Sequence, residues 1–234
     1  MDVRIRNDNG AAILISGPSG SGKTYRTMQF IIYKDDIFTN PACTQRILFY
    51  YNVETDLFKG FKHYPNIEWI NEYPTNLDYI TEVANQYKDK GGICVIIDDF
   101  ASELNQSIER LFCVLCHHKK ITTFLLVQNL FFGSKPWQRS ISLNCQHFLI
   151  FPNYRDKNQF SIFARQIEGP GSKGKYLTEA YNKISKKGDF SYLWVDCAPG
   201  QKNKLLRIRS DIFLDQWPIW IYLPRESKYE QDIE

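Results

Sequence analysis

One short segment, GPSGSGKT at residues 17–24, constrains the fold of this chain more than any other. It follows the apolar run AAILIS, which has the length of a buried strand, and it precedes a run of helical period at 25–33. The segment matches G-x-x-x-x-G-K-[ST], a loop whose backbone N–H groups point inward at phosphates while the next helix presents its positive N-terminus. A strand, this loop and a helix in that order predict a phosphate site and disfavour a chance match.

Every residue of this loop is predicted to bind the phosphates of a nucleotide, and the set is Gly17, Pro18, Ser19, Gly20, Ser21, Gly22, Lys23 and Thr24. Lys23 is expected to reach the β- and γ-phosphate oxygens, and Thr24 to supply a hydroxyl to Mg²⁺. Lys23 is therefore a predicted catalytic residue as well as a binding residue, and Thr24 a predicted metal ligand.

Two acids follow a second apolar run, ICVII, and are the predicted partners of the metal and of the attacking water. We expect Asp98 to hold Mg²⁺ through water and Asp99 to polarise the water that attacks the γ-phosphate. Unpaired carboxylates at the end of a buried strand would be costly, which favours a functional role. The alternative is that one of them caps a following helix, a role that does not exclude the first.

Three further polar residues are candidates for the same chemistry. Gln128 ends the apolar run TTFLLV, where an amide can touch both the γ-phosphate and the water, so it is a predicted sensor; a loop residue without that duty is the alternative. Arg139 is a predicted catalytic residue that would reach a neighbouring subunit's nucleotide, with Arg165 as the other candidate. A surface or DNA contact is the competing explanation for each arginine.

Apolar runs of strand length alternate with stretches of helical period, which predicts an α/β fold with a mainly parallel sheet and helices on both faces. Runs such as ICVII and FLLV are apolar throughout, as in strands that are covered on both sides. The predicted strands are 12–16, 46–51, 67–70, 93–98, 123–127, 147–151, 192–195 and 205–209, and the predicted helices are 25–33, 77–88, 104–115, 157–167 and 176–186.

The length of 234 residues favours one large domain, predicted at 1–224, with a polar C-terminal tail at 225–234. Hydrophobic residues make up 43% and charged residues 24%, which excludes collagen, a disordered chain and a disulfide miniprotein. Apolar stretches are about ten residues long, whereas a membrane span needs about 20, so no membrane insertion is expected. The N-terminus lacks a signal peptide, so we expect a chain that is not secreted and six cysteines that are free.

The net charge of +3 conceals an uneven distribution. Residues 155–209 contain 12 Lys and Arg and 5 acids, a net charge of +7, which leaves −4 for the rest of the chain. A segment of this kind can form a positive face for a phosphate backbone. The alternative is a set of solvated lysines without a partner.

The run Cys113-Val-Leu-Cys116-His117-His118 matches half of a zinc site, with Cys145 or His147 as possible further ligands. It also matches a haem-attachment motif, which we reject because that chemistry belongs to exported chains. The favoured interpretation is a buried helix face whose two histidines lie at the helix C-terminus, where imidazolium suits the dipole.

The order GPSGSGKT, CVIIDDF, a helix ending in HH, TTFLLVQNLF, RSISLNCQHFLIF and FARQI resembles FtsK/HerA-type DNA-packaging ATPases of Polinton (Maverick) elements, adintoviruses, virophages and poxviruses. The resemblance covers residues 11–220. It implies a RecA-like P-loop NTPase core that uses ATP and Mg²⁺, assembles as a homo-oligomeric ring (pentamer or hexamer) and pumps double-stranded DNA into a preformed capsid. Cellular FtsK-type pumps usually carry Glu beside the metal-binding Asp, and this chain carries the shorter Asp99.

The same resemblance implies a capsid vertex or other virion proteins as partners, and the host-cell cytoplasm or nucleus, or the virion, as the location. Two other functions stay open at this stage. A nucleoside or nucleotide kinase would need a lid, for which 169–175 is the available loop. A non-catalytic, nucleotide-gated scaffold would bind nucleotide without turnover. A GTPase is disfavoured because no N-K-x-D-like signal follows the loop, and a nuclease domain has no room in 234 residues.

Overall fold

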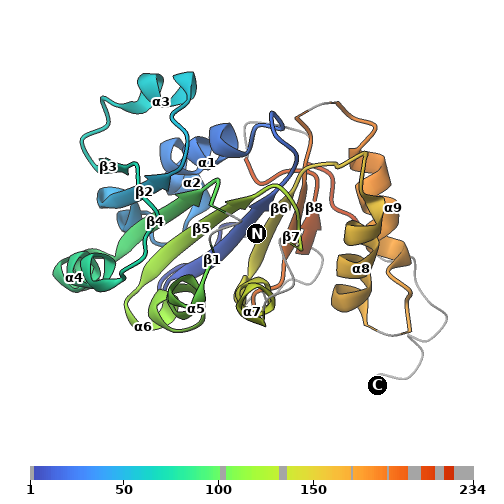
Figure 1. The fold of residues 1–234 in the computed structure, drawn as a ribbon. Helices are drawn as coiled ribbons and strands as arrows, with labels where there is room; N and C mark the ends of the chain where they lie inside the picture. The colour runs from blue at the N-terminus through green and yellow to red at the C-terminus, as the bar shows by residue number, and fades with distance from the viewer. Residues whose placement is uncertain are drawn as a thin grey trace.

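The fold is built on one eight-stranded sheet with the strand order β3-β2-β4-β5-β1-β6-β7-β8 (Figure 1). The computed structural model describes residues 3–100, 104–131, 136–169, 171–188, 190–199, 207–213 and 219–223, so the predicted tail at 225–234 lies outside the described residues. The strands are β1 (Ala11–Ser16), β2 (Ile47–Tyr51), β3 (Ile67–Ile70), β4 (Ile93–Asp98), β5 (Ile121–Val127), β6 (His147–Ile150), β7 (Leu193–Asp196) and β8 (Ile208–Arg209).

The sheet is mainly parallel, as predicted. Strands β3, β2, β4, β5, β1 and β6 pair in parallel, whereas β7 is antiparallel to β6 and β8 is antiparallel to β7. Each predicted strand is present, with ends that shift by a few residues. Strands β4 and β5 are buried along their whole length, which agrees with their uninterrupted apolar sequences.

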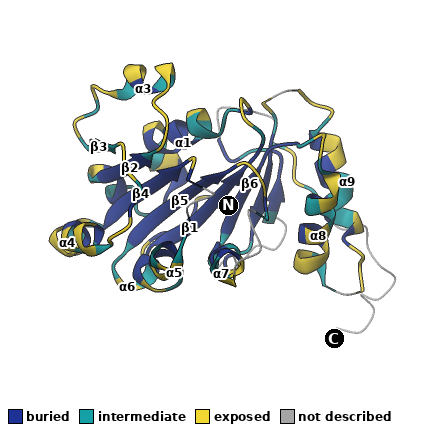
Figure 2. Cartoon of the chain, viewed as in Figure 1, coloured by how far each residue is buried: buried dark blue, intermediate teal, exposed yellow. Residues whose placement is uncertain are grey.

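Helices cover both faces of the sheet, and they are α1 (Lys23–Ile32), α2 (Lys34–Ile37), α3 (Asp56–Phe61), α4 (Asp78–Tyr87), α5 (Gln106–Arg110), α6 (Cys116–His118), α7 (Pro136–Asn144), α8 (Lys157–Glu168) and α9 (Lys175–Ile184). Short 3₁₀ helices occupy Pro41–Gln45 and Lys88–Lys90. Figure 2 shows the buried sheet between helices whose outer sides are exposed.

Successive side chains of β1 point to opposite faces of the sheet, so the core has two layers. Ile13 and Ile15 pack on the side of α1, with Phe30 and Trp194, while Leu14 packs on the opposite side with α4, α5, α7, α8 and α9. This arrangement confirms the predicted α/β fold with helices on both faces. Within the described residues, no helix is both long enough and apolar enough to cross a membrane.

The predicted helix at 104–115 is present but contains a π-helical turn. After α5, residues Leu111–Leu115 form that turn, and α6 continues to His118. The side chain of Asn105 accepts hydrogen bonds from Ser107 N at 2.9 Å and Ile108 N at 3.3 Å, so Asn105 caps α5 and neither Asp98 nor Asp99 does. His117 and His118 lie in the last turn, which confirms that part of the interpretation.

Candidate active site

The loop at 17–22 connects β1 to α1 at the carboxyl edge of the parallel strands. Gly17 N donates a hydrogen bond to Val127 O on β5 at 3.1 Å, and Ser21 N donates one to Pro18 O at 3.2 Å. Gly20 and Gly22 have φ angles of 78° and 94°, in the left-handed region that glycine adopts without a steric cost. The sequence therefore folds here into a tight cradle of backbone amides.

Lys23 extends into this cradle. Its Nζ donates to Gly17 O at 2.8 Å and Pro18 O at 3.1 Å. Burial lowers the pKa of Lys23, although the charges of Asp98 and Asp99 act in the opposite direction. Within the described residues, the buried Ser21 Oγ has no hydrogen-bond partner. The oxygens of a triphosphate are acceptors for both groups, so the loop fits a polyphosphate.

Thr24 and Asp98 meet beside the cradle, where Thr24 Oγ1 donates to Asp98 Oδ2 at 2.8 Å. Asp98 is only 8% exposed, and burial raises its pKa to about 6, while the Thr24 hydrogen bond and the Lys23 charge lower it by less. Hydroxyl and carboxylate oxygens are the ligands that Mg²⁺ prefers, and a divalent cation would favour the charged form of this buried carboxylate. The residues present therefore fit Mg²⁺.

Asp99 and Gln128 also come together, from the ends of the neighbouring strands β4 and β5. Gln128 Nε2 donates to Asp99 Oδ1 at 3.4 Å, and both side chains are exposed. Asp99 has a φ of 63°, a left-handed conformation that is uncommon outside glycine and that Asp tolerates better than most residues. Polar groups that a water molecule can reach therefore lie next to the phosphate cradle.

Asn52 is a site residue that the sequence reasoning missed. Its Nδ2 donates to Asp99 O at 3.2 Å, and its backbone N donates to Asp98 O at 3.3 Å, so it holds the backbone of both acids. The signal was the same as for Gln128, an amide that directly follows a buried strand. To predict the role of Asn52 from this signal, one would have to know that β2 pairs with β4.

Replacing Asp99 by asparagine is expected to reduce the turnover of ATP by about 10²–10⁴-fold, the usual contribution of a general base. Affinity for a non-hydrolysable ATP analogue should change little, because Asp99 lies beyond the phosphate loop. Phosphate release and analogue binding measure the two effects. Asp89→Asn, a change of the same charge outside the site, is the control, and an unchanged turnover in Asp99→Asn would remove Asp99 from the role of base.

The two candidate arginines lie on α7 and α8, and no hydrogen bond joins either of them to the phosphate loop within the described residues. Arg139 is exposed on α7, which packs against α5 and the π-helical turn on the face of the sheet opposite α1. Arg165 is exposed on α8, where its Nε donates to Ser161 O at 3.3 Å. The role of either arginine across a subunit interface stays a prediction.

The cysteines of the zinc alternative lie near one another, with Cys116 and Cys145 buried and Cys113 half-buried. The Cys116 thiol contacts Ile121 O at 3.2 Å, and burial raises the pKa of Cys116 to about 12, which opposes the thiolate form that binds zinc. Among the residues that the structure describes, no group of three or more His, Cys, Asp and Glu side chains is placed to hold a metal ion.

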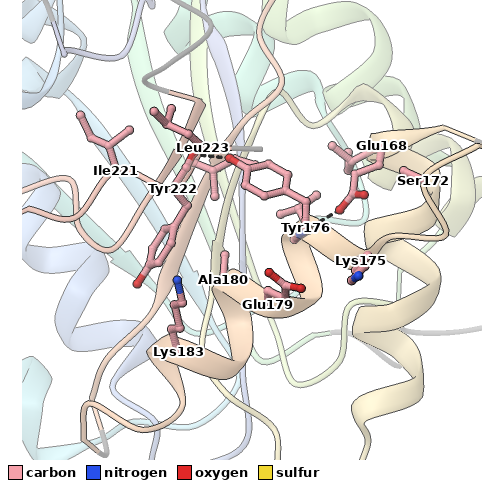
Figure 3. Close-up of a pocket in the computed structure, with 13 residues that line it drawn as sticks. Glu168, Ser172, Lys175, Tyr176, Glu179, Ala180, Lys183, Ile221, Tyr222 and Leu223 are labelled. Atoms are coloured by element: carbon pink, nitrogen blue, oxygen red, sulfur yellow. Dashed lines mark hydrogen bonds between the residues drawn. The ribbon is translucent and has the colours of Figure 1, made fainter. Parts of the chain in front are cut away.

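A cavity of about 760 Å³ lies between α9 and the segment 219–223, and none of its lining residues belongs to the phosphate loop (Figure 3). Two polar groups in it are used internally, because Leu177 N donates to Glu168 Oε1 and the Tyr176 hydroxyl donates to Tyr222 O. The volume is in the range of small-molecule sites, but the chemistry of the predicted residues lies elsewhere.

The basic residues of 155–209 concentrate on α8, α9 and their flanks. The acids of the described part of 155–187 are only partly exposed. Eight of the basic residues are exposed, and we call them the α8–α9 basic surface: Arg155, Lys157, Arg165, Lys173, Lys175, Lys183, Lys186 and Lys187. Arg209 does not belong to this surface, contrary to the expectation from the sequence. It is 1% exposed, its Nη1 donates to Val3 O at 3.2 Å and its guanidinium lies 6.0 Å from the Trp194 ring. Lys202 and Lys204 lie outside the described residues.

Strand β5 lies between β1, which carries the phosphate loop, and β4, which carries the acids. This order, the loop between β1 and α1, and the mainly parallel sheet define a RecA-like P-loop NTPase fold. No family model matches the sequence, and no curated protein matches it.

Solved structures do match. The genome packaging NTPase B204 of Sulfolobus turreted icosahedral virus 2, in complex with ATP-gammaS, matches with a TM-score of 0.52 and 16% identity, over 94% of this chain and 100% of that chain. B204, the DNA-packaging ATPase from Sulfolobus turreted icosahedral virus, matches with a TM-score of 0.54 and 16% identity over the same shares. A likeness at this identity shows the fold.

Proposed function

We propose that this chain is an ATP-hydrolysing motor that moves double-stranded viral DNA into a preformed capsid. It acts as a homo-oligomeric ring of five or six subunits, with a capsid vertex or other virion proteins as partners. Its place of action is the site of virus assembly in the host-cell cytoplasm or nucleus. The observation that carries the proposal is that a complete phosphate site and the α8–α9 basic surface occur together in one fold.

The hydrolytic half of the proposal follows from the residues at the carboxyl edge of the sheet. The amides of 17–24 and the Lys23 ammonium bind the phosphates. Thr24 and Asp98 would hold Mg²⁺, which would supply positive charge to the phosphate oxygens. Asp99 accepts the proton of the attacking water, and Gln128 orients that water. These roles favour attack by water over transfer to a second substrate.

Two observations support DNA movement: the positive charge of the α8–α9 basic surface, and hydrogen bonds that connect its helices to elements around the site. Eight exposed cations bind a phosphate backbone without reading its sequence, as a motor that tracks DNA requires. The start of α8 contacts the loop after Gln128, because Phe131 N donates to Gln159 Oε1 at 3.3 Å. Asn153, which follows β6, donates through its backbone N to the Tyr181 hydroxyl of α9 at 2.6 Å. These hydrogen bonds link the elements around the site to the two helices of the basic surface, as a motor that couples hydrolysis to DNA movement requires.

The similar structures add support from their own descriptions. They are described as a genome packaging NTPase and a DNA-packaging ATPase, and one of them was solved with the analogue AMPPCP. Because each chain covers nearly all of the other, the likeness extends over the whole fold rather than over the phosphate loop alone.

The proposal is tested by the ATPase rate of the purified chain against the concentration of double-stranded DNA at low salt, together with the oligomer mass. Stimulation by DNA in an assembled oligomer is the expected result. Equal rates with and without DNA contradict the motor. Phosphate transfer to a nucleoside monophosphate would instead favour the kinase, and nucleotide binding without turnover in the assembled oligomer would favour the scaffold.

Removing two charges from the α8–α9 basic surface is expected to weaken DNA binding and to lower the slope of log affinity against log salt by about two, because each phosphate contact contributes about 0.9. The variant is Lys157→Gln with Lys186→Gln, which leaves Lys187 in its contact with the Trp220 ring at 4.9 Å. ATPase without DNA should be unchanged. Lys59→Gln with Lys88→Gln, which removes the same charge elsewhere, is the control, and equal salt slopes in all three proteins would exclude this surface.

A further inference from the structure

An exposed aromatic ring lies against the phosphate loop and has no part in the chemistry above. Phe190 is 61% exposed, and a Cβ placed on Gly22 would lie 3.3 Å from its Cδ1 and 3.9 Å from its Cε1. The ring edge therefore lies where a side chain at position 22 would be, beside the last glycine before α1. Single exposed aromatics are common, so the position of this ring rather than its exposure carries the argument.

The backbone that carries Phe190 is held in place two residues later. Tyr192 is fully buried, its hydroxyl donates to Asp211 Oδ1, and Ile212 N donates to that hydroxyl at 3.3 Å. The Tyr192 ring lies 5.1 Å from the guanidinium of Arg26, in the first turn of α1. The segment 190–192 thus runs along the first turn of α1, and Phe190 is presented from a fixed position.

The part of a nucleotide that lies beside Phe190 follows from what the phosphate loop binds. The loop amides and Lys23 take the β- and γ-phosphates, so the α-phosphate, ribose and base of a nucleotide leave the loop beside the first turn of α1. Within the described residues, Phe190 is the ring that would meet a side chain at Gly22, beside this exit. Every nucleobase has a π-face, and stacking on an aromatic ring stabilises it without hydrogen bonds.

We propose that Phe190 forms one wall of the nucleobase site and stacks on the base of the bound nucleotide. This inference rests on the proposed function, since it assigns the base subsite of the same nucleotide. A phenyl ring offers no hydrogen-bond donor or acceptor, so this wall binds adenine and guanine alike. Any preference for ATP over GTP therefore comes from other groups.

The test compares ligands that have a base with one that has none. Calorimetry on the full chain with Mg²⁺ uses AMPPCP, GMPPCP and inorganic tripolyphosphate as probes. Phe190→Ala is expected to raise the Kd for AMPPCP and GMPPCP about tenfold each, within the range that stacking on an aromatic ring gives. The Kd for tripolyphosphate should stay within twofold, which also shows that the variant is folded. Phe190→Trp should bind like the unsubstituted chain.

Leu143→Ala is the matched control, because Leu143 is 66% exposed on α7 and lies outside the site, so its loss should leave all three affinities unchanged. An unchanged Kd for AMPPCP in Phe190→Ala would overturn the inference while the proposed function stands. Equal weakening of AMPPCP and tripolyphosphate would overturn it too, since the ring would then support the loop rather than the base. An unsubstituted chain that binds none of the probes would overturn the proposed function itself.

Discussion

Replacing Lys23 by methionine is expected to reduce the ATPase rate by about 10²–10³-fold, the effect of removing one preorganised donor to transition-state charge. The Lys23 ammonium lies within the phosphate cradle, 2.8 Å from Gly17 O. Within the described residues, the nearby Ser21 hydroxyl and loop amides carry no formal charge that could replace it. Methionine keeps an unbranched apolar stem, so the loss is confined to the ammonium.

Stability provides an independent readout for this variant. Burial lowers the pKa of Lys23, so the charged ammonium costs the folded, nucleotide-free protein free energy at pH 7. Lys23→Met should therefore unfold at the same temperature as the unsubstituted chain or at a higher one. Thermal unfolding and phosphate release measure the two quantities, with Lys88→Met as the control. A rate within threefold of the unsubstituted rate would contradict the assignment.

Much of the fold could be predicted because its strands are buried on both faces. The uninterrupted apolar sequences of β4 and β5 left few alternatives, and six of the eight strands pair in parallel, as such sequences favour. Helix α3 was not predicted, since it has six residues and buries only Phe58. A helix this short carries too little periodic signal to be recognised.

The site could be predicted where the signal lies in contiguous sequence. The loop 17–24 is such a segment, and the structure brings Thr24 to Asp98 and Gln128 to Asp99. Asn52 escaped prediction because its role depends on which strands are neighbours. Only the position of β2 beside β4 places Asn52 next to Asp99.

The net charge of a segment predicted the basic surface less reliably than the motif at 17–24 predicted the phosphate site. A count of charges treats Arg209 and Lys186 alike. In the structure, however, Arg209 on β8 is buried beside Trp194, where the negative charge of Asp196 favours its charged guanidinium. Helices present their long cations outward, as on α8 and α9, whereas a strand covered on both faces buries them. The basic surface is therefore narrower than the segment 155–209 and lies on α8, α9 and the residues that flank them.

Replacing Asp98 by asparagine is expected to abolish Mg²⁺-dependent ATPase activity and, at the same time, to stabilise the nucleotide-free protein at neutral pH. The asparagine side chain can still accept the Thr24 hydrogen bond, but it cannot offer a charged oxygen to the metal. The loss of turnover follows from the weaker hold on Mg²⁺, and the gain in stability follows from the pKa of Asp98.

The sign of the stability change follows from that pKa. Burial raises it from 3.8 to about 6, so the folded protein binds the proton more tightly than the unfolded chain does. The contribution of Asp98 to stability is thus fully present below pH 3.8 and is lost as the pH rises through 6. At pH 7.5 the ionised carboxylate costs up to about 3 kcal/mol, at 1.36 kcal/mol for each pH unit. Asparagine does not ionise and avoids this cost.

Urea unfolding at two pH values tests the prediction. Asp98→Asn should exceed the unsubstituted chain in free energy of unfolding by up to about 3 kcal/mol at pH 7.5, and by about a third of that at pH 4.5. A difference that does not change with pH would mean that another effect of the substitution is responsible. Mg²⁺ with AMPPCP should stabilise the unsubstituted chain more than the variant, because the charge of Mg²⁺ would offset the cost of the buried carboxylate in the folded protein. Equal stabilisation of both proteins would remove Asp98 from the metal site.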